Sequence, residues 1–141
     1  MTVKEIARPR DDVVTATPDT AVWDLAQLME ANSVGSVIIE RDDEIASIVT
    51  DLALEIVAKQ QLEDLTAEGV MTKDVFTVNG DYELFDVFAE MDENNVRRIP
   101  VEENGQLAGI IMLDDMLAVL HSKMGNVTEV VIAESPPHPN L

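Results

Sequence analysis

The residues best suited to chemistry lie at two places where an apolar run meets a predicted helix, residues 48–53 and 110–115. A helix amino terminus offers unpaired backbone N–H groups and the positive end of the helix dipole, which favour bound anions such as phosphate. A hydroxyl at the cap and a carboxylate three residues later share one face of the first turn. Such a pair can bind a ribose diol and a phosphate. The alternative is plain helix capping by Thr50 and Asp114.

Arg97 and Arg98 are the second informative pair, because the chain has few basic residues. The guanidinium group is planar and permanently charged, and it binds phosphate with two parallel hydrogen bonds. The pair therefore predicts a phosphate contact. The alternative is an ordinary surface ion pair, which contributes little to stability.

Other reactive groups do not combine into a site. His121 follows the apolar end of a helix without a second ligand, and His138 lies in a Pro-rich tail, so neither a metal site nor a catalytic triad can be assembled. The chain has no cysteine, no GxGxxG and no GxxxxGK. We therefore expect no enzyme activity, no catalytic residue, no metal and no cofactor.

The elements that position these residues come from an internal repeat with an offset of 62 residues, which pairs Thr15 with Thr77 and Ile48 with Ile110. Repeats of this length are supersecondary units that bury their apolar faces against each other. At this offset Arg97 and Arg98 replace Gly35 and Ser36 of the first copy.

Each copy has the pattern strand, helix, strand, strand, helix. The predicted elements of the first copy are 13–15, a helix from 22 that is closed by 32–33, 34–39, 45–49 and 50–59. Those of the second copy are 75–78, a helix with its apolar face over 84–91, 96–101, 107–112 and 114–121. Thr17 or Asp19 is the expected cap of the first helix, and Asn104 and Gly105 form a hairpin turn. Short segments at 3–7 and 65–71 precede the copies, and the second of them bridges the repeats together with 62–64. We expect repeats at 1–61 and 62–124 and a C-terminal tail at 125–141, whose Pro-rich end at 134–141 is frayed.

The composition limits the partners. The chain has 28 Asp and Glu against nine Lys and Arg, a net charge of −19, spread along its whole length. Such a surface repels nucleic acid, and it is typical of proteins adapted to high salt. With no membrane span or signal peptide in the sequence, we expect a cytoplasmic protein from a halophile with no membrane partner.

The tandem pattern, with NSVGSVIIE and IVTD in one copy and NNVRRIPVEENGQLAGIIMLDD in the other, resembles a paired cystathionine-β-synthase (CBS) domain protein over about residues 2–124. The resemblance implies an α/β fold of two β-α-β-β-α repeats, packed through their sheets with pseudo-twofold symmetry. It also implies two clefts that bind adenosine-containing ligands, and a homodimer of modules.

The family's ribose motif is a turn Gly, two apolar residues, Ser or Thr, two further residues and Asp. In the first copy Thr50 supplies the hydroxyl but Ala53 replaces the Asp; in the second copy Asp115 supplies the Asp but Met112 replaces the hydroxyl. The resemblance therefore favours the cleft around Asp115, with Gly109 leaving room for the ligand. The residues expected at the ligand are Asp115, Thr77, Val78, Arg97, Arg98, Pro100 and Gly109, with Thr15 and Thr50 at the other cleft.

We expect a stand-alone regulatory module that binds an adenine nucleotide (AMP, ADP, ATP or an S-adenosyl compound) and signals to an unknown regulated protein by rearranging its repeats or its dimer. The alternative is a degenerate pair that serves only for dimerisation or protein interaction, which Ala53 and Met112 support.

Overall fold

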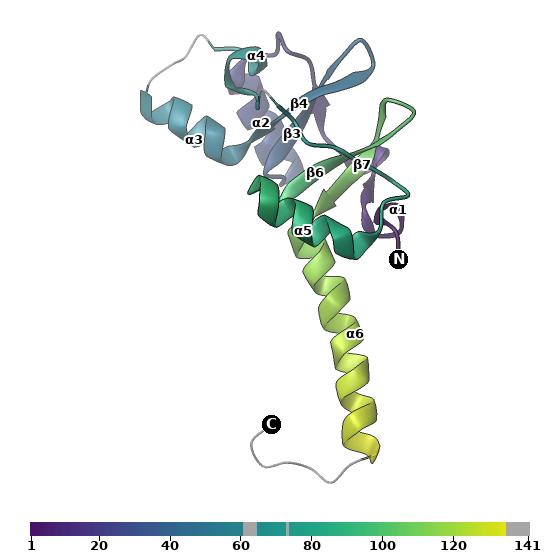
Figure 1. The fold of residues 1–141 in the computed structure, drawn as a ribbon. Coiled ribbons are helices and arrows are strands. Elements are labelled where there is room, and N and C mark those ends of the chain that lie inside the picture. Colours follow the sequence, from purple (N-terminus) through teal and green to yellow (C-terminus); the bar gives the residue numbers. More distant parts are fainter. Residues whose placement is uncertain (61–64, 73, 135–141) are drawn as a thin grey trace.

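The computed structural model describes residues 1–60, 65–72 and 74–134 (Figure 1). The predicted bridge at 62–64 and the Pro-rich tail with His138 lie outside the described residues.

The first repeat folds around a three-stranded sheet. Its elements are β2 (Thr15–Ala16), α2 (Val22–Asn32), β3 (Ser36–Arg41), β4 (Glu44–Thr50) and α3 (Asp51–Gln60). The strand order is β2-β3-β4, with β2 parallel to β3 and β3 antiparallel to β4. This is the predicted order of elements.

The second repeat has the same order of elements. They are β5 (Val78–Asn79), α5 (Leu84–Asn94), β6 (Arg98–Glu103), β7 (Gln106–Met112) and α6 (Leu113–Glu134). Its sheet has the order β1-β7-β6-β5, and the added edge strand β1 (Arg8–Pro9) comes from the amino-terminal segment. The predicted α/β fold of two β-α-β-β-α repeats is confirmed.

The short segments that precede the repeats each pack on the other repeat. Helix α1 (Val3–Ile6) places Val3 in the core of the second repeat, next to Val87 and Met116. Helix α4 (Ala67–Val70) places Ala67 in the core of the first repeat. The short 3-10 helix η1 (Arg10–Asp12) then leads the chain from β1 to β2. This reciprocal exchange ties the two repeats together.

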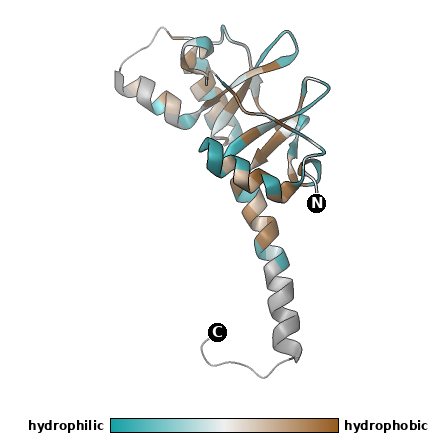
Figure 2. Cartoon of the chain, in the orientation of Figure 1, coloured by the Kyte–Doolittle hydropathy of each residue, from teal (hydrophilic) through white to brown (hydrophobic). Residues whose placement is uncertain are grey.

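The two sheets also contact each other directly. Ile38 and Ile48 of the first sheet form one buried cluster with Leu107 and Ile110 of the second. Each sheet therefore buries one face against its own helices and the other against its partner sheet. Figure 2 shows the apolar residues on the strands and the polar residues at the hairpin turns.

Both hairpins turn through two residues in the left-handed region. Asn104 and Gly105 connect β6 to β7 with φ of 54° and 79°, and Asp42 and Asp43 connect β3 to β4 with φ of 53° and 63°. Two-residue turns with positive φ match the twist of antiparallel strands, and Asn, Asp and Gly tolerate them. The hairpin predicted at Asn104 and Gly105 is confirmed.

Two local predictions are wrong. Helix α2 begins at Val22 after Ala21, without a side-chain cap, because the Leu65 carbonyl accepts the Val22 N–H at 2.9 Å. Thr17 and Asp19 instead bond to each other in the preceding turn. Helix α6 continues to Glu134, past the predicted end at 121, because no proline interrupts the chain before Pro136. Figure 1 shows α6 projecting beyond the two sheets.

The contact between the sheets predicts that two Leu→Ala substitutions lower the free energy of unfolding by very different amounts. Leu107→Ala removes a side chain that is 3% exposed and should lower the free energy of unfolding by about 2–5 kcal/mol. The matched control Leu117→Ala alters a side chain that is 47% exposed and should change it by about 0.5 kcal/mol or less. Chemical denaturation measures both, and equal losses would contradict the assigned core.

Candidate ligand-binding clefts

The two strand-to-helix corners face a common cleft between the repeats. The first corner contributes Thr50 and Asp51, and the second contributes Met112, Leu113 and Asp114. The cleft has a volume of about 600 Å³, within the range of small-molecule sites. We call it the larger cleft.

Part of the larger cleft is apolar. Val75 and Phe76, just before β5, line it together with Ile48 and Pro100. Phe76 also packs against the core of the second repeat, which fixes its position. An apolar wall beside a few polar groups is the common composition of a site for an organic ligand.

Arg97 and Arg98 both line the larger cleft, but their settings differ. Arg97 is exposed, and its backbone carbonyl accepts the Leu113 N–H at 2.9 Å. Arg98 is 30% exposed, and its Nη1 donates to the Gly35 carbonyl at 3.1 Å and lies 4.0 Å from Asp51 Oδ1. Of the pair, Arg98 thus makes the ion pair that the sequence left as an alternative.

Gly35 makes room for the Arg98 side chain. A Cβ atom at Gly35 would lie 2.5 Å from Arg98 Nη2, so the guanidinium of the second repeat rests directly on the backbone of the first. The Gly35 carbonyl also accepts the Asp51 N–H at 3.0 Å. One carbonyl therefore links Arg98 to the start of α3.

A second, smaller cleft of about 210 Å³ occupies the equivalent position on the other side of the repeats. Val13 and Val14 line it at the offset of 62 from Val75 and Phe76. Arg8, Asp12 and Arg98 supply charged groups. Among the described residues, Arg98 and Met112 line both clefts.

The Asp115 carboxylate forms an ion pair with Arg8. Arg8 Nε lies 3.1 Å from Asp115 Oδ2, and Arg8 Nη2 lies 3.4 Å from Oδ1, so the guanidinium engages both carboxylate oxygens. Arg10 holds the same amino-terminal segment through Glu40 at 3.1 Å and the Leu107 carbonyl at 3.2 Å. The segment that supplies β1 and η1 is thus fastened over the Asp115 corner.

Gly109 serves the contact between β1 and β7. It pairs with Pro9, and a Cβ there would lie 2.2 Å from the Arg8 carbonyl oxygen. Strand β1 therefore fills the space beside Gly109 in which the CBS resemblance led us to expect a ligand. At the equivalent position in the first repeat, the buried Ser47 donates its hydroxyl to the Thr72 carbonyl.

In the described part of the chain, no group of three His, Cys, Asp or Glu side chains is placed to hold a metal ion. Of the helices within that same part, none combines the length and the apolar character needed to cross a bilayer.

A family comparison matches both repeats. The CBS domain family model matches residues 3–54 and again residues 67–122. The chain belongs to the CBS domain family. An uncharacterized protein of Methanopyrus kandleri is 33% identical over 124 residues, which cover 84% of this chain and 62% of that relative's length.

Two solved CBS structures share the fold. The CBS domain pair of MJ0100, in complex with 5′-methylthioadenosine and S-adenosyl-L-methionine, gives a TM-score of 0.80 at 21% identity and covers 87% of this chain and 98% of that one. CBSX2 in complex with AMP gives 0.77 at 24% identity, with 86% and 98% covered. CBSX2 is an Arabidopsis thaliana protein.

The structure divides the site residues predicted from the CBS resemblance. Thr50, Arg97, Arg98 and Pro100 line the larger cleft, with Thr50 directly before α3 as expected. The other five do not line it. They are Thr15, Thr77, Val78, Gly109 and Asp115.

Those five residues have other positions in the CBS pair. Thr15 pairs with Ile38 inside the first sheet, and Val78 is buried in the second core with Thr77 just before it. The prediction placed the segment 76–78 beside Asp115, but Phe76 faces the cleft of Thr50 while Asp115 faces Arg8. Asp114 lies inside the first turn of α6, so the capping alternative is wrong for it.

The sequence reasoning missed three features of the clefts. The Arg98 side chain packs against Gly35 of the other repeat. Arg8 forms an ion pair with Asp115. Asp51 and Asp114 add carboxylates to the larger cleft. The offset that aligns Gly35 with Arg97 was a usable signal for the first feature. The pairing of Arg8 with Asp115 had none, because the residues are 107 positions apart.

The close contact at Gly109 yields a test. Gly109→Ala should displace β1 and lower the free energy of unfolding by about 1–3 kcal/mol, because its methyl group meets backbone. Gly80→Ala is the control, since a Cβ there meets mainly the flexible end of Glu103 at 2.7 Å. Urea denaturation compares them, and an equal or smaller cost at Gly109 would contradict the assigned role.

Proposed function

We propose that this CBS pair is a non-catalytic regulatory module that binds an adenine nucleotide or an S-adenosyl compound in the larger cleft. The observation that carries the proposal is the combination in one 600 Å³ cleft of an apolar segment, a hydroxyl and two guanidinium groups. AMP, 5′-methylthioadenosine and S-adenosyl-L-methionine in complexes of proteins with the same fold support the adenosine class.

Each part of such a ligand has a counterpart in the cleft. The base would lie against Val75 and Phe76, where backbone groups can pair with its edge. The phosphate would bind Arg97 and Arg98. Thr50 would bond to the ribose or the phosphate, while Ala53 leaves the first repeat without the ribose carboxylate of the motif.

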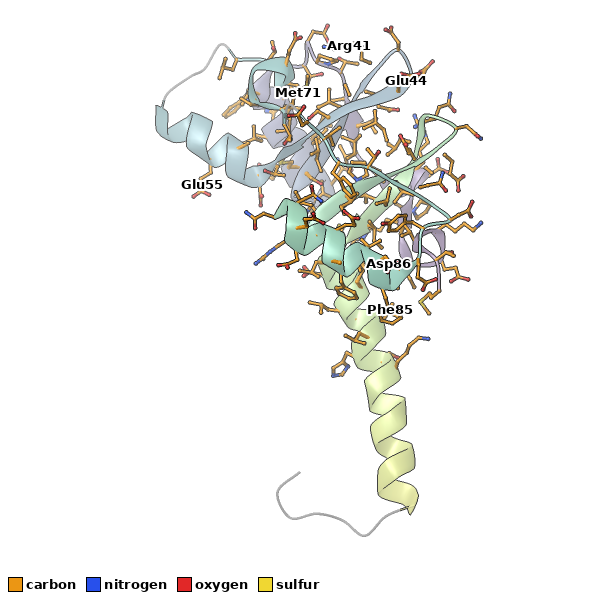
Figure 3. All side chains as sticks on the ribbon, viewed as in Figure 1. Arg41, Glu44, Glu55, Met71, Phe85 and Asp86 are labelled. Atoms are coloured by element: carbon orange, nitrogen blue, oxygen red, sulfur yellow. The ribbon has the colours of Figure 1, made fainter. Side chains whose placement is uncertain are left out.

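Signalling would follow from where these residues originate. Thr50 belongs to the first repeat, whereas Phe76 and Arg97 belong to the second, so a bound ligand favours one arrangement of the repeats over others. Trp23 on α2 and Phe85 on α5 are 70% and 51% exposed (Figure 3 labels Phe85). We propose that these helices form a homodimer interface through which the shift reaches a regulated partner.

A degenerate, interaction-only module remains the second candidate. Ala53 and Met112 interrupt the ribose motif, and the surviving Asp115 is engaged by Arg8. The same exposed helices would then serve dimerisation without any ligand.

Ligand binding should raise the thermal midpoint of the protein. We would measure unfolding in molar KCl, which screens the net charge of −19, with AMP, ADP, ATP, S-adenosylmethionine and GTP. A ligand at about 100 times its dissociation constant adds about 2.7 kcal/mol of stability, a rise of several degrees. A selective rise with adenine compounds is expected, and a flat response would favour the interaction-only module.

Arg97→Ala tests the site. It should weaken AMP binding by about tenfold or more, because it removes the exposed guanidinium from the cleft. Arg41→Ala is the matched control, since Arg41 pairs with Glu68 away from the clefts and should leave the affinity unchanged (Figure 3). Equal effects of the two changes would place the phosphate elsewhere.

A further inference from the structure

The larger cleft contains more acidic than basic side chains. Among the described residues that line it, Arg97 and Arg98 are cationic, while Asp51, Asp74 and Asp114 are anionic. The net charge of −19 on the whole chain also provides no long-range attraction for an anionic ligand. The cleft can therefore neutralise only a small negative charge on a ligand.

The two arginines do not contribute equally. Arg98 already donates to the Gly35 carbonyl and lies 4.0 Å from the Asp51 carboxylate. Arg97 has an exposed side chain at the mouth of the cleft. One phosphate group engages a guanidinium through two parallel N–H donors, so this pair can satisfy one phosphate well.

Two of the carboxylates line the cleft close to the arginines. Asp51 begins α3, and Asp114 lies in the first turn of α6, so they border the cleft at the two corners that flank the arginines. Each additional phosphate brings negative charge toward these groups, and the repulsion grows as the separation falls. The carboxylates at these corners should thus weaken the binding of a di- or triphosphate.

We propose that the larger cleft selects an adenosine ligand with a single phosphate over a di- or triphosphate, with Asp114 as a specificity-determining residue. The inference rests on the proposed function and specifies its ligand class. Affinity would rise from adenosine to AMP, because the arginines gain a partner, and would fall from AMP to ADP and ATP. A change in the ratio of these nucleotides would then control occupancy.

Calorimetric titration of the full chain tests this order with adenosine, AMP, ADP and ATP as probes. Magnesium is left out, and KCl is kept at the lowest concentration at which the protein remains folded by circular dichroism. We expect ATP to bind at least tenfold more weakly than AMP. Raising the KCl concentration should narrow this gap, because the screening length falls to about 3 Å at 1 M salt.

Asp114→Asn should narrow the ratio of ATP to AMP dissociation constants by about threefold, because it removes one of the negative charges that repel the additional phosphates. Asp86→Asn is the matched control, because it removes one exposed carboxylate from α5 outside the cleft (Figure 3). Equal or tighter binding of ATP, adenosine binding tighter than AMP, or an equal effect of the two changes would overturn the selectivity. Failure of all four probes to bind would also overturn the selectivity, and it would reject the adenine-nucleotide part of the proposed function.

Discussion

The apolar contact between the two sheets is the constraint on which the other features depend. Ile38 and Ile48 of the first sheet pack against Leu107 and Ile110 of the second in one buried cluster. Since the contact brings the ends of β4 and β7 together, it also brings together the helix starts that follow them. The clefts are therefore a geometric consequence of burying the sheets, and the residues at the corners decide what each cleft can bind.

The two copies have diverged at these corners. In the larger cleft, Thr50 faces Arg97 and Arg98, while the offset positions in the smaller cleft hold Met112, Gly35 and Ser36. Because Gly35 has no side chain, Arg98 can reach the backbone of the first repeat, and it therefore lines both clefts. On the smaller side, Arg8 and its strand cover the corner that retains Asp115. A nearly symmetric scaffold thus presents one open cleft and one that is partly filled by the protein itself.

The sequence predicted the fold well because its signals were local or repeated. The offset of 62 fixed the order of elements twice, and Asn104 with Gly105 identified a hairpin from backbone preference alone. The start of α2 could not be predicted, because its first N–H bonds to the distant Leu65 carbonyl. For the site, Thr50, Arg97, Arg98 and Pro100 were placed in one cleft by the fold, whereas Asp115 and Gly109 were not. Which strand-to-helix corner faces which segment depends on the relative orientation of the two repeats, and local sequence does not encode that orientation.

The central claim is that an adenine ligand binds in the larger cleft, between Thr50, Phe76 and the two arginines. The most direct measurement is a titration of 15N-labelled protein with AMP, followed by amide chemical shifts. The account predicts that the largest changes fall on Thr50, Phe76, Arg97 and Asp114. Changes concentrated on Val13, Val14 and Ile110, which line the smaller cleft, or no changes at saturating AMP, would contradict it.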